Sequence, residues 1–316
     1  MDPLAIVMRK LTKVYRGHVG RGPVCSVDRL DLEIGAGEVF GFLGQNGAGK
    51  TTTIKMLCGL LKPTSGEAAI FGESVRHHRT RRFIGYLPEN PYFYEYLTPP
   101  ETLDFYGRLH GLSVPERERT WNTLSELLEL GPIAGMRVRH FSKGMRQRLG
   151  FAVAMVGDPP VLILDEPMSG LDPMGRHHIR QVILGQRERG KTVFFSSHVL
   201  SDVEQICDRV GVLSSGRLIA QGRIDALVSR HVSGIEIVAS GLSAEAGDRL
   251  ASMALRARIS EAGRHFEVDT PEASDSLIAA ILHEGGRLVE VTPFRDSLED
   301  YFVRIQTDTA RGEVSA

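Results

Sequence analysis

The chain has 316 residues, enough for one large domain and a smaller one. Apolar residues make up 42% and charged residues 24%, an ordinary globular composition that argues against a long disordered tract. The formal net charge of -1 indicates no particular class of partner, and the short basic run with Arg79, Arg81 and Arg82 is interpreted as a solvated helix face, not a nucleic-acid groove.

The amino-terminal part is expected to form strands. Residues 5–40 read as strands separated by polar turns at 16–23 and 35–37, and residues 39–43 form a short buried strand. A glycine-rich stretch then opens into a helical segment at 50–59. Two later apolar strands, 161–164 and 192–195, alternate with helical segments, which is typical of a parallel sheet covered by helices.

The rest of the chain predicts two further regions. A mostly helical insert is expected from about 99 to 155, and in it Trp121, Leu124, Leu127 and Leu128 recur at helical spacing and are interpreted as core. After Gly222 the pattern changes to strands at 235–240, 265–268 and 287–291 and an amphipathic helix at 272–283. We therefore expect two domains, residues 1–222 and a small α+β domain at 223–316.

The strongest local signal is a G-x-x-x-x-G-K-[ST] loop at residues 44–51, placed directly between a strand and a helix. Its glycines let successive backbone N–H groups point at phosphate oxygens, and the helix N-terminus favours negative charge. Lys50 is expected to neutralise the β- and γ-phosphates, and Thr51 to bind Mg²⁺. The alternative is a chance match, against which the flanking strand and helix argue. The expected nucleotide contacts here are Gln45, Asn46, Gly47, Ala48, Gly49, Lys50, Thr51 and Thr52.

Two carboxylates end the strand at 161–164. A core does not tolerate such a pair without cationic partners, and a nearby Mg²⁺ supplies one. Asp165 is expected to hold the metal, through water, and Glu166 to orient or deprotonate the attacking water. The alternative is a strand that merely emerges into solvent.

A histidine, His198, lies just past the carboxyl end of the strand at 192–195. Ligands of open α/β sheets gather at that edge, so the phosphate loop, the carboxylate pair and His198 support one another. A lone histidine is usually structural or solvated, and the two histidine pairs at 77–78 and 177–178 are interpreted in that way.

The order of these motifs resembles the nucleotide-binding subunit of ABC transporters over roughly the first 220 residues. The segment 141–148 is similar to the family's signature sequence, residues 169–172 to its D-loop, His198 to its switch histidine, and Tyr86–Glu89 to its Q-loop. Three motifs depart from the usual pattern: Lys143 and Met145 stand in the signature, Glu89 replaces a glutamine in the Q-loop, and Gln45 replaces a proline in the phosphate loop.

The resemblance implies an α/β fold with a P-loop NTPase (RecA-like) core, an antiparallel β subdomain and a helical subdomain. It also implies a head-to-tail dimer, in which Ser142 and Gly144 of one subunit cover ATP bound to the other. Asp172 then connects the two sites, and Tyr15 stacks on adenine. Glu89 is expected to reach Mg²⁺ or the attacking water, a catalytic role that it shares with Glu166 and His198.

The tail at 296–302 resembles the ending of ATPase subunits of ABC-2 type exporters; the alternative is an ordinary amphipathic helix. The first hypothesis is therefore an ATP-hydrolysing exporter subunit that pairs with a second copy or a related ATPase subunit and with a membrane-spanning permease. The second is a soluble ABC ATPase acting on ribosomes or DNA, and the third is a nucleotide-gated module with slow or no hydrolysis. No nucleic-acid partner is expected under the first.

The location expected from the sequence is cytoplasmic, on the inner face of the cell membrane. Three widely spaced cysteines, Cys25, Cys58 and Cys207, indicate neither a disulfide framework nor a zinc site, which fits a reducing compartment. Residues 1–10 lack the features of a secretory signal, and no apolar run approaches the roughly 18 residues that cross a bilayer. The C-terminal domain is expected to be regulatory or dimerising.

Overall fold

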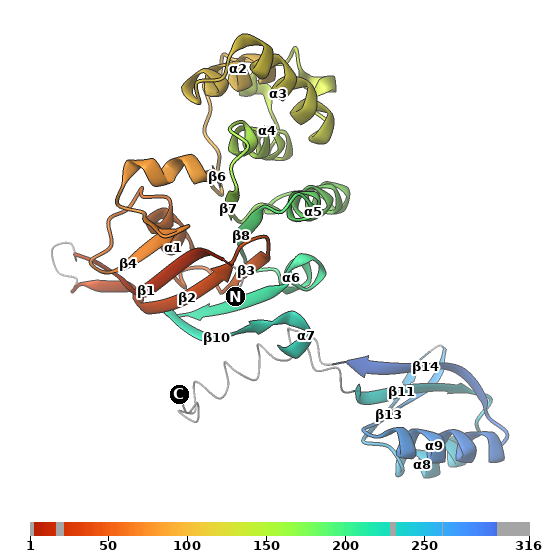
Figure 1. The fold of residues 1–316 in the computed structure, drawn as a ribbon. Helices are drawn as coiled ribbons and strands as arrows, with labels where there is room; N and C mark the ends of the chain where they lie inside the picture. Colours follow the sequence, from red (N-terminus) through yellow and green to blue (C-terminus); the bar gives the residue numbers. More distant parts are fainter. Residues whose placement is uncertain (1–2, 17–21, 228–231, 261, 296–316) are drawn as a thin grey trace. The chain divides into compact units, whose positions relative to one another are not determined.

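The computed structural model describes residues 3–16, 22–227, 232–260 and 262–295 (Figure 1). By its internal contacts the chain divides into two units, Met1–Arg223 and Ile224–Ala316. The first unit ends one residue after the change of pattern at Gly222. Each unit has its own sheet and its own apolar core.

The first unit contains a four-stranded antiparallel sheet with the order β2-β1-β4-β5. Buried residues are interspersed with exposed ones along its two long strands, because only one face of the sheet packs against the core. The strands are β1 (Leu4–Tyr15), β2 (Val24–Gly35), β4 (Ser65–Ile70) and β5 (Glu73–Ser74).

The second sheet of this unit has six strands in the order β10-β9-β3-β8-β7-β6. All neighbours pair in parallel except β10 with β9. Every residue of β3, β7 and β8 is buried, as expected for parallel strands covered on both faces. The strands are β3 (Val39–Leu43), β6 (Ile84–Leu87), β7 (Val161–Asp165), β8 (Thr192–Ser197), β9 (Arg209–Ser214) and β10 (Arg217–Arg223).

The helices of the first unit include the predicted helical insert. They are α1 (Lys50–Leu57), α2 (Pro99–Leu109), α3 (Val114–Leu127), α4 (Lys143–Met155), α5 (Pro173–Glu188) and α6 (Leu200–Ile206), with short 3₁₀ turns at His78–Phe83, Gly131–Ile133 and Val138–His140. Of the four residues predicted to form the core of the insert, Leu124 and Leu128 are buried, but Trp121 and Leu127 are only half-buried. The buried face of this helix is therefore narrower than the spacing of its apolar residues predicts. In the described part of the chain, none of the helices combines the length and apolar character needed to cross a bilayer.

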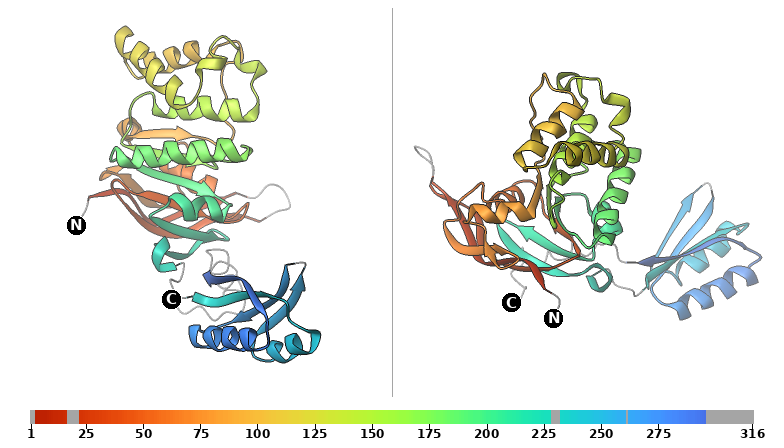
Figure 2. Two further views of the ribbon diagram at one scale, coloured as in Figure 1. Left: turned by 90° about the vertical axis from the view of Figure 1, so that its right-hand side faces the viewer. Right: turned by 45° about the horizontal axis from the view of Figure 1, so that its top comes forward.

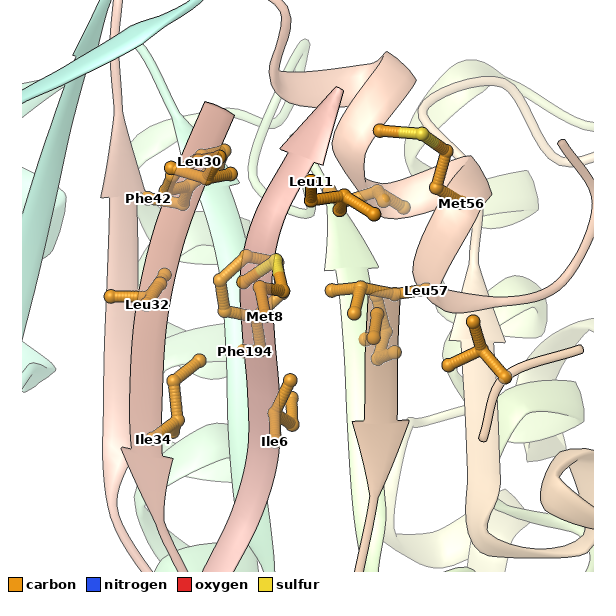
Figure 3. Packing of buried hydrophobic residues seen from close by; sticks show 14 of the residues in the cluster. Ile6, Met8, Leu11, Leu30, Leu32, Ile34, Phe42, Met56, Leu57 and Phe194 are labelled. Carbon is orange, nitrogen blue, oxygen red and sulfur yellow. The ribbon is translucent and has the colours of Figure 1, made fainter. Parts of the chain in front are cut away.

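The main core lies between the two sheets of the first unit (Figure 3). Residues of the antiparallel sheet, such as Met8 and Leu32, face Phe42 and Phe194 of the parallel sheet. The rings of Phe42 and Phe194 lie with centroids 5.3 Å apart. This packing fixes β3, and with it the start of the loop that follows it.

The second unit is an α+β unit around an antiparallel sheet with the order β12-β13-β11-β14. Its helices α8 and α9 lie on one face of that sheet (Figure 2). Buried residues of this core include Ile237, Phe266 and Leu277. The elements are α7 (Ile224–Leu227), β11 (Val232–Ser240), α8 (Ala244–Ala251), β12 (Arg256–Ser260), β13 (Gly263–Val268), α9 (Pro271–His283) and β14 (Arg287–Arg295). The tail at 296–302, on which an exporter resemblance rests, lies outside the described residues.

Candidate nucleotide-binding site

The phosphate loop joins the end of β3 to the start of α1. Gly47 has φ 86° and Gly49 has φ 109°, backbone conformations that favour glycine. At Gly49 a Cβ atom would lie 2.3 Å from the carbonyl oxygen of Ser26, so the close approach of β2 also requires glycine there. These two glycines therefore allow the loop to pack closely against β2 of the neighbouring sheet.

Lys50 is folded back over this loop. Its Nζ donates to the carbonyl oxygen of Gly44 at 2.5 Å and lies 3.2 Å from Oε1 of Glu166. The lysine side chain is only 6% exposed, and that of Glu166 only 10%. A buried ammonium group beside a glycine-rich loop at a helix N-terminus is suited to a polyphosphate, which carries more negative charge than the carboxylate of Glu166.

A cleft of about 470 Å³ opens beside the loop. The carboxyl ends of β3, β6, β7 and β8 lie next to one another in the parallel sheet, and this edge brings together residues that are distant in the sequence. The cleft is lined by Ser26, Gln45, Asn46, Gly47, Gly49, Lys50, Thr51, Thr52, Glu89, Glu166, Ser169 and His198. The phosphate loop, Glu166 and His198 thus converge as the sequence predicts, and Glu89 lies with them.

Glu166 is held by its backbone in an uncommon conformation. Its φ of 49° follows the last residue of β7, and its N–H donates to Oγ of Ser196 at 2.9 Å. That hydroxyl donates in turn to Oδ1 of Asp165 at 2.7 Å. A positive φ costs energy for a side chain such as glutamate, and here it is maintained by a buried hydrogen-bond chain.

The two carboxylate oxygens of Glu166 have different surroundings. Oε2 lies 2.8 Å from Nδ1 of His198, whereas Oε1 is buried and has no hydrogen-bond partner beyond its ion pair with Lys50. An incompletely satisfied carboxylate oxygen at a cleft can accept a proton or orient a water molecule.

A divalent cation fits the oxygen-rich chemistry of this edge. Thr51 lines the cleft, and so does Glu89, whereas Asp165 is 1% exposed and lies beneath the lining. Among the described residues, no group of three or more histidine, cysteine, aspartate or glutamate side chains could hold a metal by itself. Magnesium commonly takes one or two protein ligands together with substrate phosphates, so this donor set suits an ion that arrives with a nucleotide.

Several predicted contacts lie outside the cleft of this chain. Ser142 is exposed and its Oγ accepts from the N–H of Met145 at 3.3 Å, which caps α4. Asp172 is also exposed and caps α5 by accepting from the N–H of Gly175 at 2.8 Å. Gly144 is half-buried. The structure does not bring these three residues to the phosphate loop of the same chain.

Tyr15 lies near the loop without lining the cleft. It is 41% exposed, and its hydroxyl lies 3.5 Å from Oγ1 of Thr52. Ser26 donates to the same oxygen at 3.0 Å. Ser26 is a cleft residue that sequence reasoning missed, because nothing local marks a serine of β2 as a neighbour of α1.

Asp202 is a second residue that sequence reasoning missed. It is 3% exposed and lines a small hollow of about 110 Å³ together with His198. Burial raises its pKa, although Arg176 and Arg180 lie 3.6 Å and 3.7 Å away and oppose that shift. His198 thus lies beside a buried carboxylate that two partly exposed arginines face.

Comparison with known proteins identifies the family. The profile described as ABC transporter matches residues 27–169. An uncharacterized ABC transporter ATP-binding protein of Synechocystis sp. is 40% identical and covers 93% of this chain and 82% of that protein. The bacitracin transport ATP-binding protein of Bacillus licheniformis is 38% identical over 93% of this chain and 95% of its own length. The Nod factor export ATP-binding protein I of Cupriavidus metallidurans is 35% identical over 94% and 96%.

Solved structures agree with these relatives. The ATP-binding subunit of an ABC transporter aligns with a TM-score of 0.63 at 32% identity, covering 71% of this chain and 91% of that one. A bacterial ABC transporter cassette solved as a dimer aligns with a TM-score of 0.65 at 25% identity, covering 69% and 98%. The predicted fold class is therefore confirmed, and the chain belongs to the ABC transporter family as an ATP-binding, ATP-hydrolysing subunit.

Proposed function

We propose that this chain is the motor subunit of an ABC-2 type exporter, in which ATP closes a dimer of two ATPase subunits and hydrolysis reopens it. The observation that carries the proposal is the separation of two surfaces: the cleft holds Lys50, Glu166 and His198, while Ser142 of the signature segment is exposed elsewhere. Two relatives are named for bacitracin transport and Nod factor export, which supports an export role.

In this proposal the phosphate loop binds ATP in the cleft of each subunit. Backbone N–H groups of the loop at 45–49 point at the phosphates, with Thr52 as a further contact. The predicted contact of Ala48 is the exception, because its N–H donates to the carbonyl oxygen of Gln45 at 3.1 Å. Lys50 exchanges its contact with Glu166 for the β- and γ-phosphates, since a polyphosphate carries more negative charge than one carboxylate. Tyr15 packs against the adenine.

Hydrolysis then depends on the groups at the edge of the parallel sheet. Once Lys50 has turned to the phosphates, Glu166 is free to accept a proton from the attacking water. His198, 2.8 Å from Oε2 of Glu166, holds that carboxylate in place and faces the γ-phosphate. Thr51, Asp165 (through water) and Glu89 would hold Mg²⁺, which supplies charge neutralisation of the phosphates when it is bound.

The signature segment completes the site of the opposite subunit. The oxygen of Ser142 accepts from Met145, so the hydroxyl proton remains available to a γ-phosphate oxygen. The N–H of Gly144 lies in the first turn of α4, where the helix dipole favours an anion. Asp172, at the N-terminus of α5, lies where it can link the two sites.

The partner of the ATPase dimer is a membrane-spanning permease, which places this chain on the inner face of the cell membrane. Closure moves the helical insert, and with it the surface near Glu89 against which the permease would lie. The small C-terminal unit is assigned a regulatory or dimerising role, and a nucleic-acid partner is not part of the proposal.

The test is isolation of the tagged full-length chain from membranes of its own cells. An exporter subunit copurifies with a multi-span membrane protein, and the permease stimulates its ATP turnover. Copurification with ribosomes or DNA, and turnover stimulated by nucleic acid, would instead favour a soluble remodelling ATPase.

A further inference from the structure

A cluster of basic side chains lies away from the nucleotide cleft. The run 76–82 contains four arginines and two histidines within seven residues: Arg76, His77, His78, Arg79, Arg81 and Arg82. It precedes the amino end of β6, whereas Glu89, which lines the cleft, follows the carboxyl end of that strand. The cluster is therefore at the opposite end of β6 from the ATP site.

Most of this positive charge is not neutralised. Arg82 pairs with Glu73 at 3.1 Å. Over the described ranges of the chain, no carboxylate lies within ion-pair distance of Arg76, Arg79 or Arg81, nor of the neighbouring Lys62, and all four are exposed. Among the described residues, these four exposed cations thus have no carboxylate partner, although the formal net charge of the protein is -1.

Local structure accounts for only part of this cluster. Arg81 donates to the carbonyl oxygen of Gly59 at 3.2 Å, just past the end of α1, and Arg76 donates to that of Gly66 at 3.3 Å. Within the part of the chain that the structure describes, the side chains of Arg79 and Lys62 make no hydrogen bond. A folding role therefore does not explain why these two positions are basic.

A hollow of about 370 Å³ lies beside part of this cluster. Lys62 and Arg76 are its exposed lining residues, and its buried lining is apolar: Met56, Pro63 and Val75. Leu60, which is 60% exposed, adjoins the lining residues Gly59 and Leu61. The surface therefore combines an anion-attracting rim with an apolar recess and an exposed leucine.

We propose that this basic surface, Lys62 and Arg76 on the rim of the hollow together with Arg79 and Arg81 of the same run, binds the headgroups of anionic phospholipids of the membrane that holds the permease. Clusters of lysine and arginine attract anionic lipid surfaces, and the apolar recess and Leu60 accept the glycerol and upper acyl region. A nucleic acid fits less well, because the run 76–82 offers no phenylalanine, tyrosine or tryptophan on which bases stack. The proposal goes beyond the exporter function, because this contact needs no permease.

The test uses the purified full-length chain without permease and measures cosedimentation with vesicles. Phosphatidylcholine vesicles are compared with vesicles of phosphatidylcholine and phosphatidylglycerol in equal parts. The variant is Lys62→Gln/Arg76→Gln/Arg79→Gln, and Arg79→Gln alone is the second variant, since its side chain makes no hydrogen bond in the described structure. The matched control, Arg119→Gln/Arg137→Gln/Arg139→Gln, removes the same charge from exposed arginines of the helical insert.

We expect binding to the anionic vesicles only, weakened about tenfold or more in the triple variant and reduced by salt, with the control variant unchanged. ATP binding by the triple variant stays at the wild-type level, so failure here is distinguishable from failure of the exporter proposal. Equal binding to both vesicle types, or wild-type binding by the triple variant, would overturn the proposal. So would full displacement by inorganic phosphate, which indicates a small-anion site, or preferential binding of single-stranded RNA.

Discussion

Glu166 in the first unit and Glu236 in the second each lie between a cation and a histidine. In the first unit Glu166 lies 3.2 Å from Nζ of Lys50 and 2.8 Å from Nδ1 of His198. These groups are drawn from three separate segments that meet at the carboxyl edge of the parallel sheet, beside a cleft.

In the second unit Glu236 has the same kinds of neighbour on adjacent antiparallel strands. Arg258 donates to its Oε1 at 2.8 Å, and Nδ1 of His265 lies 2.9 Å from the same oxygen. Nε2 of His265 lies 2.7 Å from Oγ of Ser260. The arginine side chain is 69% exposed, so water screens this cluster.

The burial and the neighbouring groups of such a cluster, more than its residue types, therefore decide what it can do. Oε1 of Glu166 is buried without a hydrogen-bond partner, beside the glycine-rich loop, whereas Oε1 of Glu236 accepts two interactions on a sheet face. The first arrangement is poised for exchange of partners, and the second is complete as it stands. Four sets of variants can break or sharpen this contrast.

The largest effect is expected from Lys50→Ala. ATP binding weakens by about 100-fold, because charge-assisted hydrogen bonds each contribute roughly 1.5–3 kcal/mol, and turnover falls below detection. Binding is measured by titration calorimetry. Lys55→Ala, on an exposed position of the same helix, is the control and leaves affinity unchanged. Wild-type affinity in Lys50→Ala would remove the lysine from the phosphate site.

A large effect on chemistry alone is expected from Glu166→Gln. Turnover falls by about 10²- to 10⁴-fold because the proton acceptor is lost, while ATP affinity changes little. Steady-state phosphate release and nucleotide titration separate the two quantities. The exposed Glu188→Gln on α5 serves as the matched substitution. Retained hydrolysis would show that the Lys50–Glu166–His198 cluster is as structural as its counterpart in the second unit.

The smallest effect is expected from Glu236→Gln, which lowers stability by about 0.5 kcal/mol at neutral pH and leaves turnover unchanged. The hydrogen bonds from Arg258 and then His265 lower the pKa of Glu236. Its stabilisation is therefore fully present above the ordinary carboxyl pKa of 4.5 and is lost as the pH falls through the lower folded value.

Calorimetric unfolding of the full chain tests this pH dependence. The difference between wild type and Glu236→Gln should vanish in strongly acidic buffer, with Glu267→Gln on the same sheet as the control. A difference that persists in acid would mean that the charge of Glu236 is not what stabilises the cluster.

The sequence alone predicts the first cluster far better than the second. Lys50 lies in a motif that demands a strand before it and a helix after it, and Glu166 and His198 follow buried strands, so a parallel sheet brings them together. Glu236 and His265 meet only through the register of β11 with β13, in which Val238 pairs with His265, and no sequence pattern specifies that register.

Residues that act across elements were missed for the same reason. Ser26 reaches Thr52 through the packing of β2 on α1, and Ser196 links Asp165 to Glu166 through neighbouring strands. Helical spacing predicts Trp121 in the core, but the residue is half-buried. The spacing shows which face of a helix packs inward but not how wide the buried part of that face is. The sequence favours a solvated face for the basic run with Arg79, Arg81 and Arg82, and it does not indicate the hollow that the nearby Arg76 lines.

The central claim is that Ser142 of one subunit meets the γ-phosphate bound by the other. The most direct measurement is ATP-dependent dimerisation by light scattering, in Glu166→Gln chains that also carry Ser142→Asn or Ser142→Asp. Both residues are good helix N-caps, so both keep the start of α4 intact, but only aspartate sets a negative charge against the phosphate. The account predicts dimers with Ser142→Asn and monomers that still bind ATP with Ser142→Asp. Equal dimerisation of the two variants would contradict it.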